Sequence, residues 1–220
     1  MNKWHPRPGL TLVLCALLGG GLPTAAAVEF PAGPAKWTVT VTPSHAADAP
    51  VPPVTRPMLS RLEVSQDEQA QVAIATWSSG TTQQRIFLRK SHQILVQEPD
   101  GNVLAVPEAG SRGREFNPGF DKTAFTWVKP SALVEPKPIT YQGKLCLHYK
   151  ATIPVPKGDD AVPGQAEASM TVEAWIDPQT GLPVAYDDGT SHADYTFLPP
   201  PYPPVVIPVE FQRAYERRVH

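Results

Sequence analysis

Cysteine is scarce in this sequence, and its scarcity excludes two common ways of stabilising a small domain. The 220 residues contain two cysteines, Cys15 and Cys146. Cys15 lies in an N-terminal apolar run that we expect to be removed, so Cys146 remains alone. An intramolecular disulfide and a zinc site built from thiolates are therefore excluded. Stability must come from packing, and we expect Cys146 to be a small residue in or near the core.

Clusters of positive charge are missing as well. The chain has 19 Lys and Arg against 21 Asp and Glu, a formal net charge of −2. No run of basic residues is longer than a pair, such as Arg217-Arg218 at the very end. Proteins that bind nucleic acid usually carry a basic face. This balance argues against nucleic acid as a partner.

Long apolar runs are absent apart from the N-terminal one. Residues 1–27 have the order of a cleavable secretory signal: basic Lys3 and Arg7, an apolar run around residues 10–17, and the small residues 25–27. The run is too short for a membrane-spanning helix, which needs about 20 residues. We predict cleavage near Ala27, a periplasmic or extracellular protein, and no transmembrane segment in the mature chain.

Catalytic and metal-binding motifs are also missing. Ser191, His192 and Asp194 are too close in sequence for a hydrolase triad, which is assembled from distant segments. Cys146 and His148 share a face of one strand but lie roughly 7 Å apart, too far for a direct hydrogen bond. No histidine pair has His-x-His or helical i, i+4 spacing. We predict no catalytic residue, no metal and no cofactor.

Proline, by contrast, is abundant, with 27 residues that gather in a few segments. This distribution disfavours long helices, because proline interrupts the helical hydrogen-bond ladder. We predict that residues 28–57 form an N-terminal strand and a proline-rich linker, and that residues 58–220 form a single antiparallel β domain. Residues 198–208 (LPPPYPPVVIP) are predicted to be an extended strap across the sheet.

Alternating apolar and polar residues predict many short strands. Residues 98–102 and 177–181 are predicted turns of β-hairpins, because each combines aspartate, proline and glycine. Residues 209–219 are predicted to form a helix, with Phe211, Tyr215 and Val219 on one face. The predicted fold is mainly β (α+β): a curved antiparallel sheet or half-barrel with a short C-terminal helix. The predicted strands span residues 36–42, 59–64, 71–77, 82–90, 93–97, 103–106, 123–128, 138–153 (with a bend at 142–143), 168–176, 182–186 and 193–197.

Aromatic residues occur on most of these strands. A curved sheet with aromatic side chains on its concave face can hold an apolar ligand. The other interpretation is that they fill an ordinary core against the C-terminal helix. The predicted ligand-binding residues are Trp77, Phe87, Trp127, Tyr149, Trp175 and Tyr186, and Trp37 and Tyr195 extend the same pattern.

One stretch resembles a known family. Residues 172–184 (VEAWIDPQTGLPV), preceded by residues 143–149 (GKLCLHY) and followed by Ile207-Pro208 and Phe211, resemble the late hairpin and closing segment of LolA-type periplasmic lipoprotein carriers. The resemblance covers residues 138–211. It implies an incurved half-barrel covered by helices, with an apolar cavity for acyl chains. The first half departs from it, because those carriers have N-terminal helices where this chain is rich in proline.

Three classes of function therefore remain open. The first is a non-catalytic envelope protein, structural or protein-binding, that uses sheet edges or the proline-rich segment to contact another envelope protein. The alternative is a carrier of lipid, lipoprotein acyl chains or another hydrophobic ligand. The third is an enzyme, which requires His92, His148 or His192 to converge with a carboxylate in one cleft.

Overall fold

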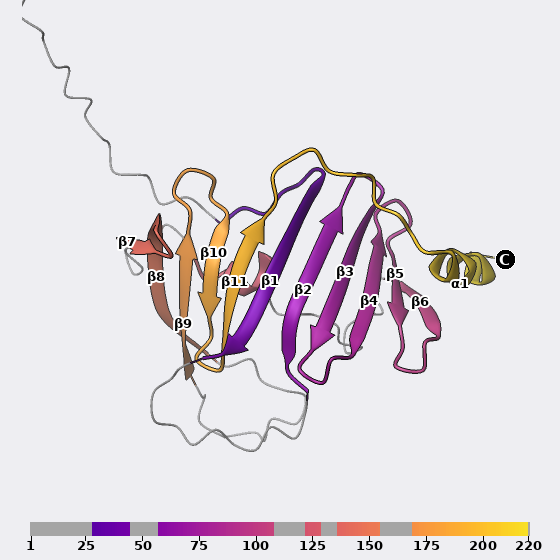
Figure 1. The fold of residues 1–220 in the computed structure, drawn as a ribbon, viewed down its shortest axis with the longest axis horizontal. Coiled ribbons are helices and arrows are strands. Elements are labelled where there is room, and N and C mark those ends of the chain that lie inside the picture. The colour runs from indigo at the N-terminus through magenta and orange to yellow at the C-terminus, as the bar shows by residue number, and fades with distance from the viewer. Residues whose placement is uncertain (1–27, 45–56, 108–121, 129–135, 155–168, 220) are drawn as a thin grey trace, which may run out of the picture.

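The computed structural model describes residues 28–44, 57–107, 122–128, 136–154 and 169–219 (Figure 1). The signal segment and residues 45–56 of the linker lie outside this part of the chain. No helix in these ranges is long and apolar enough to cross a membrane. The strands are β1 (Ala35–Pro43), β2 (Leu59–Gln66), β3 (Ala70–Trp77), β4 (Thr82–Leu88), β5 (Gln93–Gln97), β6 (Val103–Pro107), β7 (Lys137–Tyr141), β8 (Lys144–Pro154), β9 (Ser169–Ile176), β10 (Pro183–Asp187) and β11 (Ser191–Phe197). The helices are the 3₁₀ helix η2 (Lys122–Phe125) and α1 (Val209–Val219).

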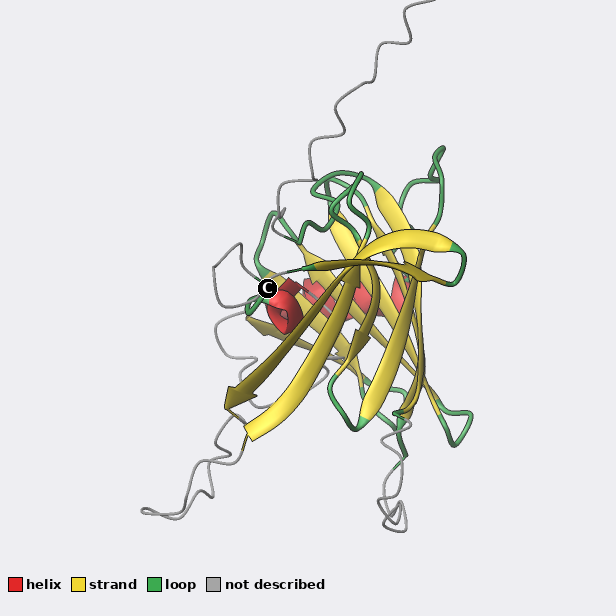
Figure 2. Ribbon diagram, turned by 90° about the vertical axis from the view of Figure 1, so that its left-hand side faces the viewer, coloured by secondary structure: helices red, strands yellow, loops and turns green. Residues whose placement is uncertain are grey.

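All eleven strands form one antiparallel sheet, in the order β6-β5-β4-β3-β2-β1-β11-β10-β9-β8-β7. Figure 2 shows that this sheet is strongly curved. Neighbours in the sheet are neighbours in sequence except at one place, where β1 lies between β2 and β11. The first strand thus joins the early and late hairpins. The prediction of a curved antiparallel sheet with a C-terminal helix is confirmed.

Short turns between the strands follow from local residue chemistry. Gln142 and Gly143 join β7 to β8 with φ angles of 47° and 76°. Two consecutive positive φ angles define the type I′ turn, whose twist matches that of the flanking strands. In the β9–β10 turn, Asp177 accepts a hydrogen bond from the backbone N–H of Gln179. Gly181 in the same turn has φ 71°.

Residues 123–128 were predicted to be a strand, and this prediction is wrong. Lys122–Phe125 form a 3₁₀ helix, and the Val128 backbone N–H then bonds the Phe125 carbonyl at 2.9 Å. Phe125 and Val128 are both buried, three residues apart. A spacing of three places two side chains on one side of a tight helical turn but on opposite faces of a strand. The helical turn therefore buries both apolar groups at once.

Two hydrophobic clusters lie on opposite faces of the sheet. In β3, Ala73 and Ala75 belong to the larger cluster, whereas Ala70 and Val72 belong to the smaller one. Since successive side chains of a strand point to opposite faces, the two clusters have the sheet between them. We call the face with the larger cluster the inner face and the opposite face the outer face.

The strap and α1 cover one half of the outer face. The Val205 backbone N–H donates to Asp67 in the β2–β3 turn at 2.9 Å, which fixes the strap to the sheet. Burial raises the pKa of Asp67, but hydrogen bonds from the Ala70, Val205 and Gln69 backbones outweigh it, and the pKa is lowered. Phe211 of α1 is fully buried against Ile86 and its neighbours. The predicted helix 209–219 is confirmed.

Candidate functional site

The inner face carries a continuous layer of buried apolar side chains. One row of side chains crosses the sheet through cross-strand partners, from Val41 through Ala193, Tyr186 and Ala174 to Tyr149. All five are at most 7% exposed. This row places residues from five strands, far apart in sequence, in one layer.

Aromatic rings cover part of this layer. Phe30, which precedes β1, contacts the rings of Trp37, Phe125, Tyr195 and Phe197 at centroid distances of 5.9–6.2 Å. Edge-to-face and tilted contacts of this kind are favourable beyond the area they bury. The segment before β1 and the 3₁₀ helix therefore pack against the inner cluster.

Among the described residues, three polar atoms of this apolar interior are buried without a hydrogen-bond partner. They are the indole Nε1 of Trp37, the indole Nε1 of Trp127 and the phenol oxygen of Tyr149. Trp37 and Tyr149 belong to the inner cluster, and Trp127 packs against it. A buried polar group that lacks a hydrogen bond costs about 1–3 kcal/mol. An indole N–H can only donate, so its missing partner must be an acceptor.

The buried tyrosines of the inner face are neutral phenols. Burial raises the pKa of Tyr149. Burial, followed by the nearby Asp188 and Asp187 carboxylates, raises the pKa of Tyr186 to about 12. Both groups therefore keep their protons at physiological pH, and the Tyr149 O–H remains available as a donor.

The structure separates the predicted ligand-binding residues into two groups. Tyr149 and Tyr186 belong to the inner cluster, and Trp77 and Trp127 pack against it. The other two, Phe87 and Trp175, are not part of the inner cluster. Phe87 pairs with Gln71 and Ile94, and its ring contacts His92. Trp175 lies between the inner-face residues Ala174 and Ile176, so it points to the outer face.

Trp175 is the centre of a second cluster, on the outer face. The His148 ring stacks on it at 4.8 Å and 19°, and the Tyr141 ring lies 5.1 Å away at 31°. His192 contacts its edge at 5.7 Å. These four rings come from β7, β8, β9 and β11, which lie close together at one end of the sheet.

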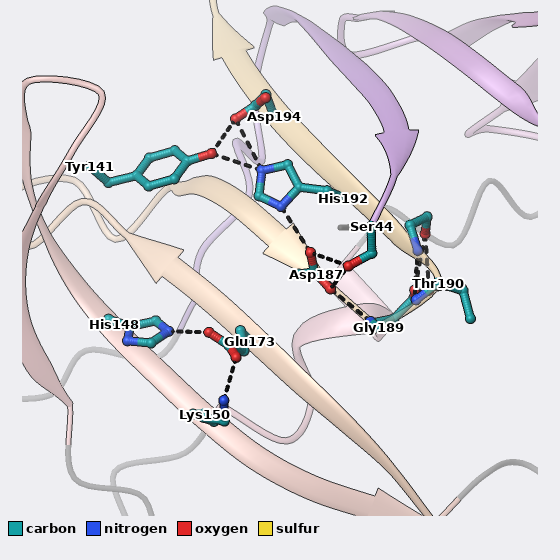
Figure 3. Close-up of polar contacts among 12 residues, drawn as sticks. Ser44, Tyr141, His148, Lys150, Glu173, Asp187, Gly189, Thr190, His192 and Asp194 are labelled. Atoms are coloured by element: carbon teal, nitrogen blue, oxygen red, sulfur yellow. Dashed lines mark hydrogen bonds and ion pairs between the residues drawn. The ribbon is translucent and has the colours of Figure 1, made fainter. Parts of the chain in front are cut away.

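Two chains of hydrogen bonds extend from this cluster (Figure 3). In the first, Glu173 accepts from Lys150 at 2.6 Å and bonds His148 Nε2 at 2.8 Å. Burial raises the pKa of Glu173, but the hydrogen bonds from Lys150 and His148 outweigh it, so the pKa is lowered. Glu173 is therefore an ionised acceptor at neutral pH.

The second chain runs through His192. Its Nδ1 lies 3.1 Å from Asp187, and its Nε2 lies 2.8 Å from the Tyr141 hydroxyl, which donates to Asp194 at 2.8 Å (Figure 3). Burial, together with the hydrogen bond to Asp194, raises the pKa of Tyr141. Gln142 also donates to Asp194, at 2.9 Å. The tip of the β7–β8 hairpin is thus fastened to β11, across the three strands between them.

Nucleophilic chemistry finds no support in these contacts. Ser191 bonds Asp188 and Ser44 bonds Asp187, so neither hydroxyl is paired with a histidine. Cys146 is fully buried, and burial together with the nearby Asp177 raises the pKa of its thiol. A buried thiol of raised pKa is a poor nucleophile. The described residues contain no group of three or more side chains suited to hold a metal ion.

An enzyme was expected to require convergence of His92, His148 or His192 with a carboxylate in one cleft, and His192 does line one cleft with Asp187 and Glu173. The structure brings His148 and His192 to the same tryptophan, whereas His92 lies in the β4–β5 turn. A signal for this cluster exists in β9. Its residues 172, 174 and 176 are all apolar, so the alternation assigns Thr171, Glu173 and Trp175 to the opposite, polar face.

Comparison with known proteins gives a resemblance in solved structures alone. The chain matches no protein-family model and no curated protein. The crystal structure of the lipoprotein LppX from Mycobacterium tuberculosis is similar with a TM-score of 0.41 and 14% identity, over 75% of this chain and 84% of that chain. LprF from Mycobacterium bovis has a TM-score of 0.41 and 15% identity, over 81% and 90%. Likeness at this level assigns neither family nor function, and the resemblance to LolA-type carriers stays a prediction.

Proposed function

We propose that this protein is an exported carrier of a hydrophobic ligand, held on the inner face of the curved sheet. The observation that carries the proposal is the set of unpartnered donors from Trp37, Trp127 and Tyr149 inside an apolar layer. The ligand class is a lipid or acyl-chain compound with ester or carboxyl oxygens. Its chains would contact the apolar side chains, and its oxygens would accept from the donors.

Binding of such a ligand combines a favourable free energy of burial with the removal of an unfavourable one. Apolar surface removed from water contributes about 25 cal/mol per Å², which favours binding of hydrocarbon to aromatic and aliphatic side chains. Buried donors without acceptors oppose folding of the empty protein. A ligand oxygen placed against these donors would remove that cost. Hydrocarbon alone would not, so the donors favour a ligand with acceptor atoms.

An envelope module that binds another protein is the competing proposal. It predicts a filled core and an exposed apolar patch. The large exposed apolar side chains of the described residues are spread over β3, β6, β8, the strap and α1. This distribution provides no single docking patch, whereas the buried inner row agrees with the filled core that the competing proposal predicts. The unpartnered donors are the observation that favours the carrier.

Native mass spectrometry of the protein purified after export tests the proposal. We expect a reproducible added mass that organic solvent extracts and that is identified as a lipid. A clean apo mass, with no uptake of a fluorescent fatty acid, would contradict the carrier proposal.

Tyr149→Phe provides the residue-level test. It removes one unpartnered hydroxyl and keeps the ring. We expect the affinity for the fluorescent fatty acid to fall about three- to tenfold, while the empty protein becomes no less stable. Tyr215→Phe, in the cluster of the other face, is the matched control and should leave the affinity unchanged. Equal affinities of the wild type and Tyr149→Phe would show that the hydroxyl is not a contact.

A further inference from the structure

A polar cleft of about 680 Å³ opens on the outer face, next to the ring cluster around Trp175. Its volume lies in the range of small-molecule sites. The cleft is formed by strands β1, β8, β9, β10 and β11 and by the turn between β10 and β11. These five strands are neighbours in the sheet. Its lining residues are Thr42, Ser44, Lys150, Thr171, Glu173, Trp175, Asp187, Gly189 and His192.

Two carboxylates are held firmly in this cleft. Glu173 and Asp187 are direct partners across the β9–β10 pair. Like charges in such positions normally destabilise a sheet. Here each has its own donors: Asp187 accepts from Ser44 at 3.0 Å, from the Gly189 backbone N–H at 2.7 Å and from His192. The donors of Glu173 are Lys150 and His148. The carboxylates are therefore pre-positioned before any ligand arrives.

The cleft retains hydrogen-bonding capacity of both kinds. Within the described chain, the hydroxyls of Thr42 and Thr171 and the indole N–H of Trp175 bond no other residue. Lys150 uses one N–H on Glu173 and has two more. A hydroxyl both donates and accepts, whereas the indole and the ammonium only donate. A ligand that satisfies this set must itself carry several groups that both donate and accept.

Charge narrows the ligand class further. An anion would face the carboxylates of Glu173 and Asp187. A cation would gain little, because Lys150 already pairs with Glu173 and the His192 ring N–H with Asp187. A pure hydrocarbon would leave the polar groups unpaired, which is costly. A neutral compound with many hydroxyls avoids the charge repulsion of an anion, the small gain of a cation and the unpaired polar groups left by a hydrocarbon.

We propose that the outer cleft binds a sugar, through its hydroxyls and against the indole of Trp175. The site is separate from the inner face, since the sheet lies between them. The sugar would be bound rather than cleaved. Glycoside hydrolysis needs one carboxyl group that holds a proton at working pH and can act as the acid. Neither carboxyl group of the cleft meets this need: despite burial, the pKa of Glu173 is lowered, because it already accepts from Lys150 and His148. Asp187 already accepts from Ser44, the Gly189 backbone N–H and His192.

The test is a titration of the exported protein with named sugars. Glucose, galactose, mannose, N-acetylglucosamine, maltose and cellobiose are each added up to 20 mM, and binding is followed by saturation-transfer-difference NMR and calorimetry. We expect at least one of them to bind saturably. No binding of any of the six by the folded protein would overturn the proposal.

Two variants place the binding in the cleft. Thr171→Val is nearly isosteric, suits an exposed strand position and should weaken binding about threefold or more through the lost hydroxyl. Trp175→Ala should weaken it about tenfold through lost apolar contact. Trp77→Ala, on the inner face, is the matched control and should bind sugar normally. Affinities unchanged in both Thr171→Val and Trp175→Ala would contradict the proposed location.

Two further measurements test whether the outer cleft and the inner face are separate sites. Uptake of the fluorescent fatty acid should be unchanged in Thr171→Val, and sugar binding should be unchanged in Tyr149→Phe. Loss of both activities in either single variant would overturn the idea of two separate sites. Release of glucose from maltose or cellobiose would contradict binding without cleavage.

Discussion

The two halves of the outer face differ in what covers them. Over β3 to β6 the outward side chains include Val72, Ile86 and Leu95, and the strap and α1 pack onto them. Over β8 to β11 and β1 the outward side chains include Glu173 and His192, and a cleft lies there instead. The backbone is the same continuous sheet in both halves. Apolar outward side chains therefore accompany a packed helix and strap in one half, and polar outward side chains accompany an open cleft in the other.

The largest loss of stability is expected in the half of the outer face over β3 to β6, which we call the covered half. Phe211→Ala removes a side chain that is fully buried between α1 and the sheet. We expect a loss of about 3–5 kcal/mol in the free energy of unfolding, because the cavity left behind adds to the lost transfer energy. Urea unfolding followed by tryptophan fluorescence measures this loss.

Arg213→Ala is the control on the same helix, because Arg213 is exposed. It should change the free energy of unfolding by about 0.5 kcal/mol or less. Equal stabilities of the Phe211→Ala protein and the wild type would mean that α1 contributes nothing to the covered half.

A smaller, pH-dependent loss of stability is expected in the half over β8 to β11 and β1, which we call the open half. Glu173→Gln removes an ionised group that is 24% exposed and bonded to Lys150 and His148. We expect a loss of roughly 1–2 kcal/mol at pH 7. The pKa of Glu173 in the folded protein lies below its ordinary value of 4.5. Its contribution is therefore present above pH 4.5 and is lost as the pH falls through the folded pKa.

Urea unfolding of both proteins at pH 7 and pH 3 checks this sign. The stability difference between the wild type and Glu173→Gln should shrink at the lower pH. Glu63→Gln, whose ion pair with Arg61 is largely exposed, is the control and should change stability by about 0.5 kcal/mol or less. A difference that grows on acidification would contradict the assigned role of Glu173.

The smallest effect is expected where the hairpin tip is fastened to the open half. Tyr141→Phe keeps the ring against Trp175 but removes the hydroxyl between His192 and Asp194. We expect a loss of about 1 kcal/mol and faster amide hydrogen exchange in β7. Tyr202→Phe, whose exposed hydroxyl bonds only the nearby Leu198 carbonyl, should leave exchange in β7 unchanged. Unchanged exchange in Tyr141→Phe would show that the hydroxyl does not hold the hairpin.

Local pattern predicted most elements of this fold but not all of them. Strict alternation, as in Trp37, Val39 and Val41 of β1, identifies a strand that is buried on one face, and the structure agrees. For residues 123–128 the predicted strand was wrong, because a short apolar run fits a strand and a helical turn equally well. The side of the sheet on which Trp175 lies also differs from the expectation, for another reason. Aromatic character was taken as a sign of the inner face, although the apolar residues on either side of Trp175 assign it to the outer one.

The sequence by itself determined where the strands, hairpin turns and final helix lie, because these depend on interactions between residues a few positions apart. Only the tertiary structure decided that β1 pairs with β11, where Trp37 lies opposite Phe197. It also decided that Tyr141 reaches His192 across 51 positions of the chain. Such contacts depend on strand order and on the curvature of the whole sheet. The inner donors and the outer cleft both combine residues from strands that are far apart in sequence, so they depend on the order of strands in the sheet.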